Sequence, residues 1–223
     1  MPRIRRGLGD NLLYHVINRG NARAQVFHKP DDYRSFINLV STATSRFSVK
    51  LYAYCLMPNH FHFLVQPEQA KDLSLCMQWL MTSHVRRYHT HYCSTGHIWQ
   101  GRFKSFIIEE DSHLLAVERY VEANPVRAAL AASALDWPWS SHCENAGVKP
   151  RNLTACSPIP LPKAWTDFVD TPLSDQELEK MHRSVNRQMP YGDENWQSRI
   201  CTAYHLESSV HPRGRPRKEL LLA

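Results

Sequence analysis

The chain lacks long apolar runs and paired cysteine motifs. None of its apolar stretches approaches the ~20 residues that a membrane-spanning helix needs. Its six cysteines are scattered without C-x-x-C spacing, which argues against a zinc ribbon or a thioredoxin-like centre. The basic first residues lead into Gly-Leu-Gly-Asp instead of an apolar signal region, and there is no internal repeat. We therefore expect a cytoplasmic protein with reduced thiols and no membrane partner.

Acidic residues are outnumbered by basic ones. The 223 residues include 27 lysines and arginines against 21 aspartates and glutamates, which gives a formal net charge of +6. Such an excess favours a polyanionic partner, because each cation placed on a phosphate releases condensed counterions. It also suits a basic enzyme with no nucleic-acid role. Composition alone leaves both classes of protein open.

Hydrophobic periodicity predicts the element order β-α-β-β-α-β-α over the first part of the chain. The four predicted strands cover residues 12–19, 50–57, 60–66 and 104–109. Pro58-Asn59 joins the second and third as a tight hairpin. The predicted helices open at Pro30, cover 71–92, and run from Asp111-Ser112 to about Asn124, before Pro125. This order fits an α+β fold, a ferredoxin-like antiparallel sheet with helices on one face.

The character of the chain changes after Ala134. Residues 135–172 are rich in proline, which predicts a wrapping linker. A capping box of Ser174 and Glu177 then predicts one helix, and Asp193 opens a second. We therefore divide the chain into three parts: a core of residues 1–134, a linker of residues 135–172, and C-terminal helices with a basic tail in residues 173–223.

Two histidines stand one residue apart on the third predicted strand. Side chains alternate along a strand, so His60, His62 and Leu64 face one way while Phe61 and Phe63 face the other. Two imidazoles one pleat apart are close enough to share a metal ion. An isolated H-x-H is more often a pair of half-exposed histidines, so the motif alone does not decide between the two.

Tyr120 and Asn124 lie four residues apart, on one face of the third predicted helix. The apolar stripe of that helix is Leu114, Val117 and Val121. Because successive residues step by about 100°, Tyr120 is expected off this stripe, toward a rim. A tyrosine placed there can reach a site instead of filling a core. The plain alternative is a partly buried tyrosine followed by a capping asparagine.

A rival group of metal-ligand types occurs in HTHYCSTGH. Its members are His89, His91, Cys93 and His97, which suit zinc. They fall at a helix end and in a loop, without a rigid strand to fix them. We therefore expect a polar connection here instead of a metal site.

Aromatic and basic residues interleave in IWQGRFKS. Trp99, Arg102, Phe103 and Lys104 are the mixture expected of a groove that stacks bases and neutralises phosphates. The alternative is a buried tryptophan that leads into an ordinary strand.

The last basic run is RGRPRK. The sequence predicts that this run enters a DNA minor groove through Arg213, Arg215, Arg217 and Lys218. Its glycine and proline keep the backbone extended, and its arginines are attracted by the negative potential of the narrow groove. The alternative is a solvated tail with no partner.

The ordered motifs MPNHFHFLV, WQGRFKS and YVEANPVRAAL resemble the REP-associated tyrosine transposases, a branch of the single-tyrosine HUH transposases. YHVINRGNARAQVF and RGRPRK fit that branch too, so the resemblance spans nearly the whole chain. It implies that Tyr120 is the nucleophile and that His60 and His62 are metal ligands. It makes Asn124 the third ligand, where relatives outside the branch often carry glutamine. The expected DNA-binding residues then also include Arg19, Asn21 and Arg127.

The resemblance implies cleavage and rejoining of single-stranded DNA beside hairpin-forming repeats, through a 5′-phosphotyrosine that leaves a free 3′ hydroxyl. The implied cofactor is Mg²⁺ or Mn²⁺, and imidazole and amide ligands suit Mn²⁺ better. We expect a nucleoid-associated monomer, although related transposases dimerise. Two other functions stay open: a sequence-specific DNA-binding protein with an idle nuclease site, and a metal-dependent phosphoesterase that uses water. Replacing Tyr120 by phenylalanine separates them.

Overall fold

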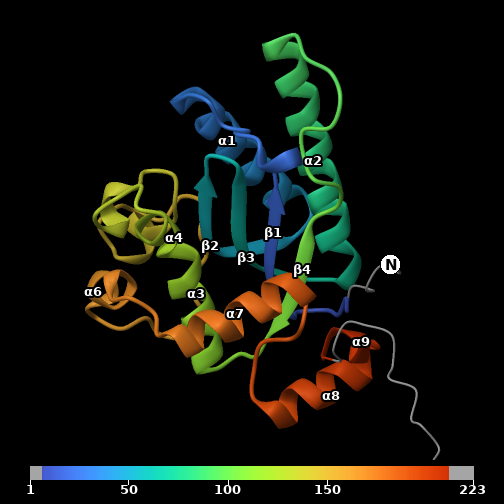
Figure 1. The fold of residues 1–223 in the computed structure, drawn as a ribbon, viewed down its shortest axis with the longest axis vertical. Helices are drawn as coiled ribbons and strands as arrows, with labels where there is room; N and C mark the ends of the chain where they lie inside the picture. The colour runs from blue at the N-terminus through green and yellow to red at the C-terminus, as the bar shows by residue number, and fades with distance from the viewer. Residues whose placement is uncertain (1–6, 211–223) are drawn as a thin grey trace, which may run out of the picture.

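The computed structural model describes residues 7–210, so the predicted role of Arg213, Arg215, Arg217 and Lys218 lies outside the described residues. A four-stranded antiparallel sheet occupies the centre (Figure 1). Its spatial order is β2-β3-β1-β4. The strands are β1 (Leu13–Arg19), β2 (Val49–Met57), β3 (His60–Pro67) and β4 (Lys104–Ile108). The predicted α+β sheet and its hairpin at Pro58-Asn59 are confirmed.

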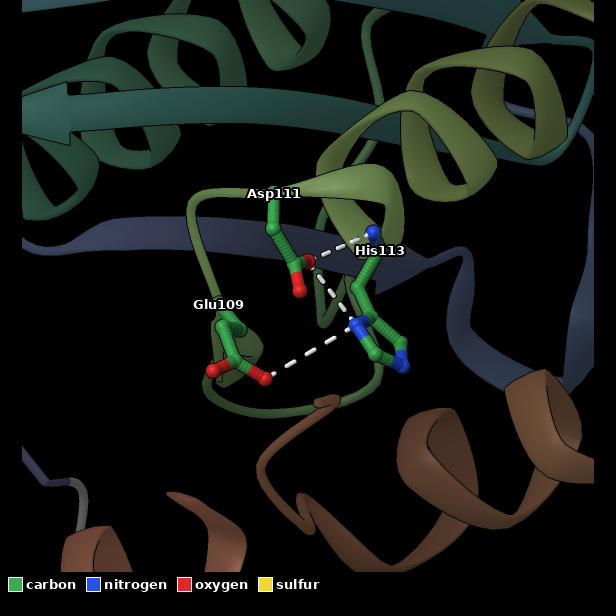
Figure 2. Close-up of side chains that lie close together, drawn as sticks. All are labelled: Glu109, Asp111 and His113. Atoms are coloured by element: carbon green, nitrogen blue, oxygen red, sulfur yellow. Dashed lines mark hydrogen bonds and ion pairs between the residues drawn. The ribbon is translucent and has the colours of Figure 1, made fainter. Parts of the chain in front are cut away.

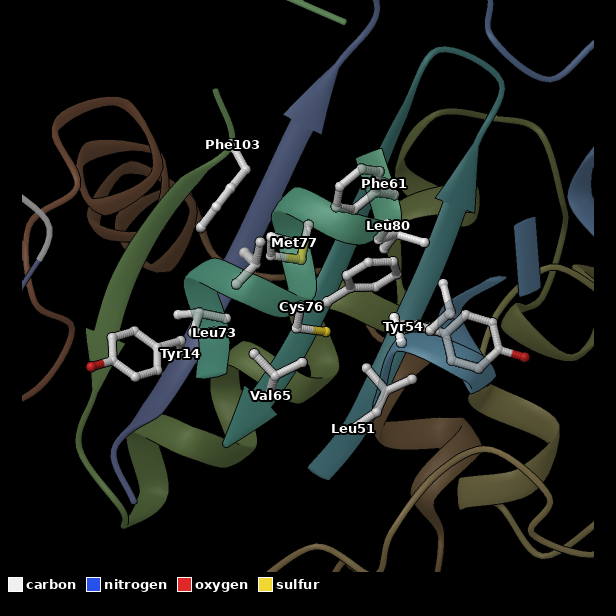
Figure 3. Close-up of a cluster of buried hydrophobic side chains, with 14 of the residues drawn as sticks. Tyr14, Leu51, Tyr54, Phe61, Val65, Leu73, Cys76, Met77, Leu80 and Phe103 are labelled. Atoms are coloured by element: carbon white, nitrogen blue, oxygen red, sulfur yellow. The ribbon is translucent and has the colours of Figure 1, made fainter. Parts of the chain in front are cut away.

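One face of the sheet is covered by α1 (Pro30–Arg46) and α2 (Ala70–Tyr92). Alternate strand residues such as Phe61 and Val65 point into this layer and meet Leu73, Met77 and Leu80 of α2 (Figure 3). Proline at the first turn of α1 suits a helix start, because its missing N–H is not needed there. This face is therefore a dry core. Of the three helices predicted for the core, α1 and α2 lie on this face, whereas α3 lies on the opposite one.

The opposite face is covered as well, which extends the predicted architecture. Here α3 (Ser112–Glu122) and α7 (Asp175–Arg187) pack on Leu64 and Phe106. The Asp111 side chain caps α3 by accepting a hydrogen bond from the His113 N–H at 2.7 Å. The short α4 (Asn124–Arg127) follows α3 directly, because Pro125 is tolerated in the first turn of a new helix.

The proline-rich segment wraps the outer edge of β2. It contains η2 (Ala134–Asp136), α5 (His142–Asn145) and α6 (Trp165–Asp170). The backbone N–H of Leu56 donates to the Trp139 carbonyl at 2.9 Å, and that of Ser141 donates to Tyr54 at the same distance. Farther along the strand, Ala155 donates to Leu51 at 2.7 Å. The segment is thus hydrogen-bonded to the sheet.

Glu122 of α3 fixes this wrapping segment from the other side. Its carboxylate is fully buried and accepts four hydrogen bonds. The donors are Ser141 Oγ at 2.5 Å, Asn145 Nδ2 at 2.6 Å, His142 Nδ1 at 2.7 Å and Trp165 Nε1 at 2.8 Å. A buried carboxyl group needs such partners. One carboxylate therefore joins α3, α5 and α6.

Beyond α7 come α8 (Glu194–Tyr204) and α9 (Glu207–Val210), while η1 (Asn21–Arg23) follows β1. The predicted capping box at Ser174 and Glu177 is present, and Asp193 caps α8. Between α7 and α8, Tyr191 lies against β4: its N–H donates to the Ile107 carbonyl at 2.8 Å, and its carbonyl accepts from Glu109 at 2.9 Å. Within residues 7–210, no helix combines the length and the apolar character that a bilayer crossing requires.

Candidate active site

His60 and His62 project from β3 toward α3, as strand alternation predicts, with ring centroids 5.0 Å apart. His60 Nδ1 lies 2.6 Å from Asn59 Oδ1, and His62 Nδ1 lies 2.8 Å from His15 Nε2. Among the described residues, no hydrogen bond engages either Nε2 atom. Two imidazoles with open Nε2 atoms on one rigid strand fit a divalent cation.

Both imidazoles are neutral at physiological pH. Burial lowers the pKa of His60 to about 4, with the charges of Arg19 and Arg127 acting in the same direction. Burial also places the pKa of His62 well below its usual value, helped by the neighbouring histidines and the same arginines. A neutral imidazole keeps the lone pair that a metal ion requires. The protonation state therefore suits the two predicted ligands.

Tyr120 lies beside these histidines. Its ring stands edge-on to His62, with centroids 5.8 Å apart. The prediction that it lies at a rim is wrong, because only 4% of the residue is exposed and it belongs to the apolar cluster of α3 and α7. The cause is the cover over the end of α3, where His182 of α7 comes within 6.4 Å of the tyrosine ring. Burial raises the pKa of Tyr120, and Arg127 and Arg19 oppose this rise.

Arg127 holds the tyrosine and Asn124 together. The centre of its guanidinium lies 3.9 Å from the Tyr120 ring centroid, a cation–π contact. It donates to the Tyr120 carbonyl at 2.9 Å and to Asn124 Oδ1 at 2.7 Å. Asn124 Nδ2 in turn donates to the carbonyls of Tyr120 and Val121. The oxygen expected to serve as the third metal ligand is thus engaged by Arg127.

The remaining predicted DNA-binding residues divide by exposure. Arg102 and Lys104 are exposed near the start of β4, and Asn21 is exposed in η1. Trp99 and Phe103 are instead 5% and 7% exposed, inside the α1/α2 core. Their predicted role as a base-stacking platform is therefore corrected, since stacking needs an open ring face. The indole N–H of Trp99 donates inward, to His84 Nδ1 at 3.2 Å.

Residues 9–124 of the chain match the family model described as Transposase IS200 like. The chain belongs to this transposase family. The family is one of enzymes, and its match covers β1 through Asn124, the region that brings His60, His62 and Tyr120 together.

Two curated proteins support the predicted branch. A REP-associated tyrosine transposase of Escherichia coli is 24% identical over 129 residues, which cover 57% of this chain and 74% of that protein. A Haemophilus influenzae protein, provisionally given the same name, is 31% identical over 100 residues, or 40% of this chain. The chain spans 56% of the length of the Haemophilus protein. The resemblance to REP-associated tyrosine transposases is confirmed.

The fold agrees with a solved structure of a REP-associated tyrosine transposase bound to a REP hairpin. The TM-score is 0.55 at 19% identity, over 74% of this chain and 96% of that one. At this identity the likeness concerns the fold. It extends past the residues matched by the family model, because 74% of the chain is more than the 9–124 segment.

The rival histidine group of this family member is dispersed. His89 bonds to Ser94 Oγ at 3.0 Å and to the Gly96 carbonyl at 3.1 Å, which closes the turn after α2. His91 Nε2 instead lies 2.6 Å from Nζ of Lys29, the residue that precedes α1. Within the described part of the chain, these side chains form no metal cluster with Cys93 and His97.

Sequence reasoning missed a different cluster, at the opposite end of α3 from Tyr120. Figure 2 shows Glu109, Asp111 and His113 turned toward one another, and their ligand atoms lie within 4.8 Å. Asp111 Oδ1 lies 2.8 Å from His113 Nδ1 and also caps α3. Glu109 Oε2 accepts the Asp193 N–H at 2.8 Å. These bonds join β4, α3 and α8, and the alternation E-x-D-x-H was the available signal.

His15 was also missed. It is fully buried in β1 and bonds directly to His62. The signal was present in the predicted strand 12–19, because His15 and Arg19 alternate onto the face that carries the histidine pair.

Proposed function

We propose that this chain cleaves and rejoins single-stranded DNA beside hairpin-forming repeats. Tyr120 would be the nucleophile, with Mn²⁺ or Mg²⁺ held by His60 and His62. The observation that carries the proposal is the approach of the Tyr120 ring to His62, whose Nε2 is open. The substrate class is supported by the relatives named for REP association and by the solved relative bound to a REP hairpin.

The reaction would exchange one phosphodiester for another. As the Tyr120 oxygen bonds to phosphorus, the bond from phosphorus to the 3′ oxygen breaks, leaving a 5′-phosphotyrosine and a free 3′ hydroxyl. The phenol proton passes to solvent and the departing oxygen takes one up. A bound divalent cation would withdraw charge from a non-bridging oxygen and orient the diester. Attack by another 3′ hydroxyl reverses the step without ATP.

The residues around Tyr120 suit this role. Burial raises the pKa of its phenol, so the hydroxyl stays protonated until substrate arrives. Arg127 and Arg19 lower that pKa and supply positive charge for the scissile phosphate. If the Arg127 guanidinium donates to that phosphate instead of to Asn124, then Asn124 Oδ1 becomes available as a third metal ligand. Two nitrogen ligands favour Mn²⁺ over Mg²⁺.

A single chain supplies the proposed nucleophile and both histidines, which supports activity as a monomer. The alternative of a DNA-binding protein with an idle nuclease site is favoured by a different observation. Tyr120 is buried and Asn124 Oδ1 is engaged, as expected of a site that no longer opens.

The test is incubation of the protein and Mn²⁺ with single-stranded hairpin repeats from the host genome. A denaturing gel should show a covalent protein–DNA adduct and a fragment with a free 3′ hydroxyl. Tyr120→Phe should abolish the adduct while keeping hairpin binding. The matched control is Tyr191→Phe, a tyrosine equally buried on the same face, which should keep the adduct.

Other outcomes identify the alternatives. Hairpin binding with no adduct from the wild-type protein would indicate an idle site. Cleavage that survives Tyr120→Phe would indicate a phosphoesterase that uses water. An adduct of full yield from Tyr120→Phe would show that another residue is the nucleophile.

A further inference from the structure

We infer that His15 is a positioning residue that selects the metal-binding nitrogen of His62, an inference that rests on the proposed function. His15 Nε2 lies 2.8 Å from His62 Nδ1, and the two rings stack with centroids 5.0 Å apart and planes inclined by 23°. Both side chains are buried, so water does not compete for this bond. His15 belongs to β1 and His62 to β3, which are adjacent strands.

The strand register explains why the two rings meet. Ile17 stands opposite His62, and His15 stands opposite Leu64. His15 and His62 are therefore diagonal neighbours on one face, within reach of ring side chains. The His15 ring is confined on other sides by Phe106, at 4.9 Å between centroids, and by Tyr120, at 6.1 Å. It cannot rotate freely.

A neutral imidazole has one N–H and one lone pair, so this bond has two arrangements. If His62 donates from Nδ1, its Nε2 keeps the lone pair and can bind a cation. If His15 donates instead, the remaining proton of His62 sits on Nε2 and blocks it. The metal-binding arrangement therefore needs an acceptor at His15 Nε2.

The other nitrogen of His15 points to the same role. Nδ1 is buried and has no hydrogen-bond partner among the described residues. An unpaired buried polar atom destabilises a fold. The imidazole is therefore poorly explained as a packing residue. It is well explained as the outer partner that fixes the tautomer and orientation of a metal ligand.

Two substitutions separate shape from hydrogen bonding. His15→Phe keeps a ring in the stack and removes the acceptor. His15→Gln removes the ring and offers a side-chain oxygen of similar reach as the acceptor. Calorimetric titration with Mn²⁺ should show at least about tenfold weaker binding for His15→Phe, and binding within about threefold of wild type for His15→Gln.

A metal-free measurement tests the bond itself. With ¹⁵N-labelled histidine, the wild-type protein should show a scalar coupling between the ring nitrogens of His15 and His62, and its absence would overturn the inference. Equal Mn²⁺ affinity for wild type and His15→Phe would overturn it too, as long as His60→Ala binds more weakly. If His60→Ala binds Mn²⁺ as well as wild type does, the proposed function fails instead.

Discussion

The two faces of the sheet use the same strands for different purposes. On the α1/α2 face, aromatic rings such as Phe36, Phe61 and Phe63 pack against one another and form a dry core. On the α3/α7 face, the alternate residues of β1 and β3 include His15, His60 and His62. A single strand, HFHFLV, thus supplies core side chains to one layer and the candidate ligands to the other. The packed α1/α2 core keeps the strands rigid, and the rigid strands hold the polar groups of the α3/α7 face in place.

The faces also differ in how their helices are held. The α1/α2 face is held by apolar contacts and by one hydrogen bond between the helices, which Tyr92 of α2 donates to Asp32 of α1 at 2.6 Å. The α3/α7 face adds buried carboxylates, Glu118 and Glu122, that hydrogen-bond to the wrapping segment. Apolar contacts carry no charge, so their contribution to stability does not change with pH. The protonation of buried carboxyl groups does change with pH. Four substitutions test this difference, ordered by their expected effect on the free energy of unfolding.

The largest effect is expected from Phe36→Ala on the dry face. The ring is fully buried and contacts Phe27, Phe61 and Trp99, so its removal leaves a cavity. Urea unfolding should show a loss of about 3–5 kcal/mol. The control is Leu75→Ala, an exposed apolar residue of α2. A loss below about 1 kcal/mol for Phe36→Ala would contradict a packed core.

Glu122→Ala on the other face should cost about 3 kcal/mol, because four buried donors lose the carboxyl group that accepts their hydrogen bonds. Limited proteolysis should then cut within residues 135–172 faster than in wild type. Glu179→Ala, which removes an exposed carboxylate of α7, is the matched control. Unchanged proteolysis would mean that Glu122 does not anchor the segment.

A pH effect is expected from Glu118. Burial, with the charge of Glu122, raises its pKa from 4.5 to about 8. Between these values the folded protein holds a proton that the unfolded chain has released. Stability should therefore fall as pH rises from 5 to 8. The unfolding free energy of Glu118→Gln should depend less on pH than that of wild type between pH 5 and 8. The control Glu110→Gln, which changes an exposed residue, should show the pH dependence of wild type. Parallel curves for all three would refute the shifted pKa.

The smallest effect on stability is expected from His60→Ala. The side chain is half-buried and neutral, so the unfolding free energy should change by less than about 1 kcal/mol. Mn²⁺ binding and adduct formation should nevertheless be lost. His91→Ala, which removes an exposed histidine of the rival group, should change neither. If His60→Ala still formed the adduct, His60 would not be needed for the cleavage reaction.

The sequence was sufficient for most of the core. Strand alternation in HFHFLV and the helical spacing of Leu73, Met77 and Leu80 reflect burial on one side, and burial is what periodicity records. The facing direction of His60 and His62 followed from the same rule. The caps at Asp111 and Ser174 were equally readable, since capping is a local interaction.

The failures concern residues whose surroundings are set by distant parts of the chain. Tyr120 lies off the apolar stripe of α3, yet α7 covers it, and no local pattern reveals a helix that arrives more than 50 residues later. Trp99 precedes β4 in an apparently open stretch, but its ring fills the space between Phe27 and Phe61. His15 was overlooked because its alternation onto the histidine face gains meaning only once β1 and β3 are known to be neighbours.

The hydrogen bonds at the two outer strands have a further consequence. An uncovered edge strand presents a row of backbone groups that can pair with a second molecule and start aggregation. Here the segment around Trp139 and Ser141 occupies the free side of β2, and Tyr191 occupies part of the free side of β4. The regions after the core thus act as covers against unwanted strand addition. A fragment that ends at residue 134 would keep the histidines and Tyr120, but its sheet would be exposed to self-association.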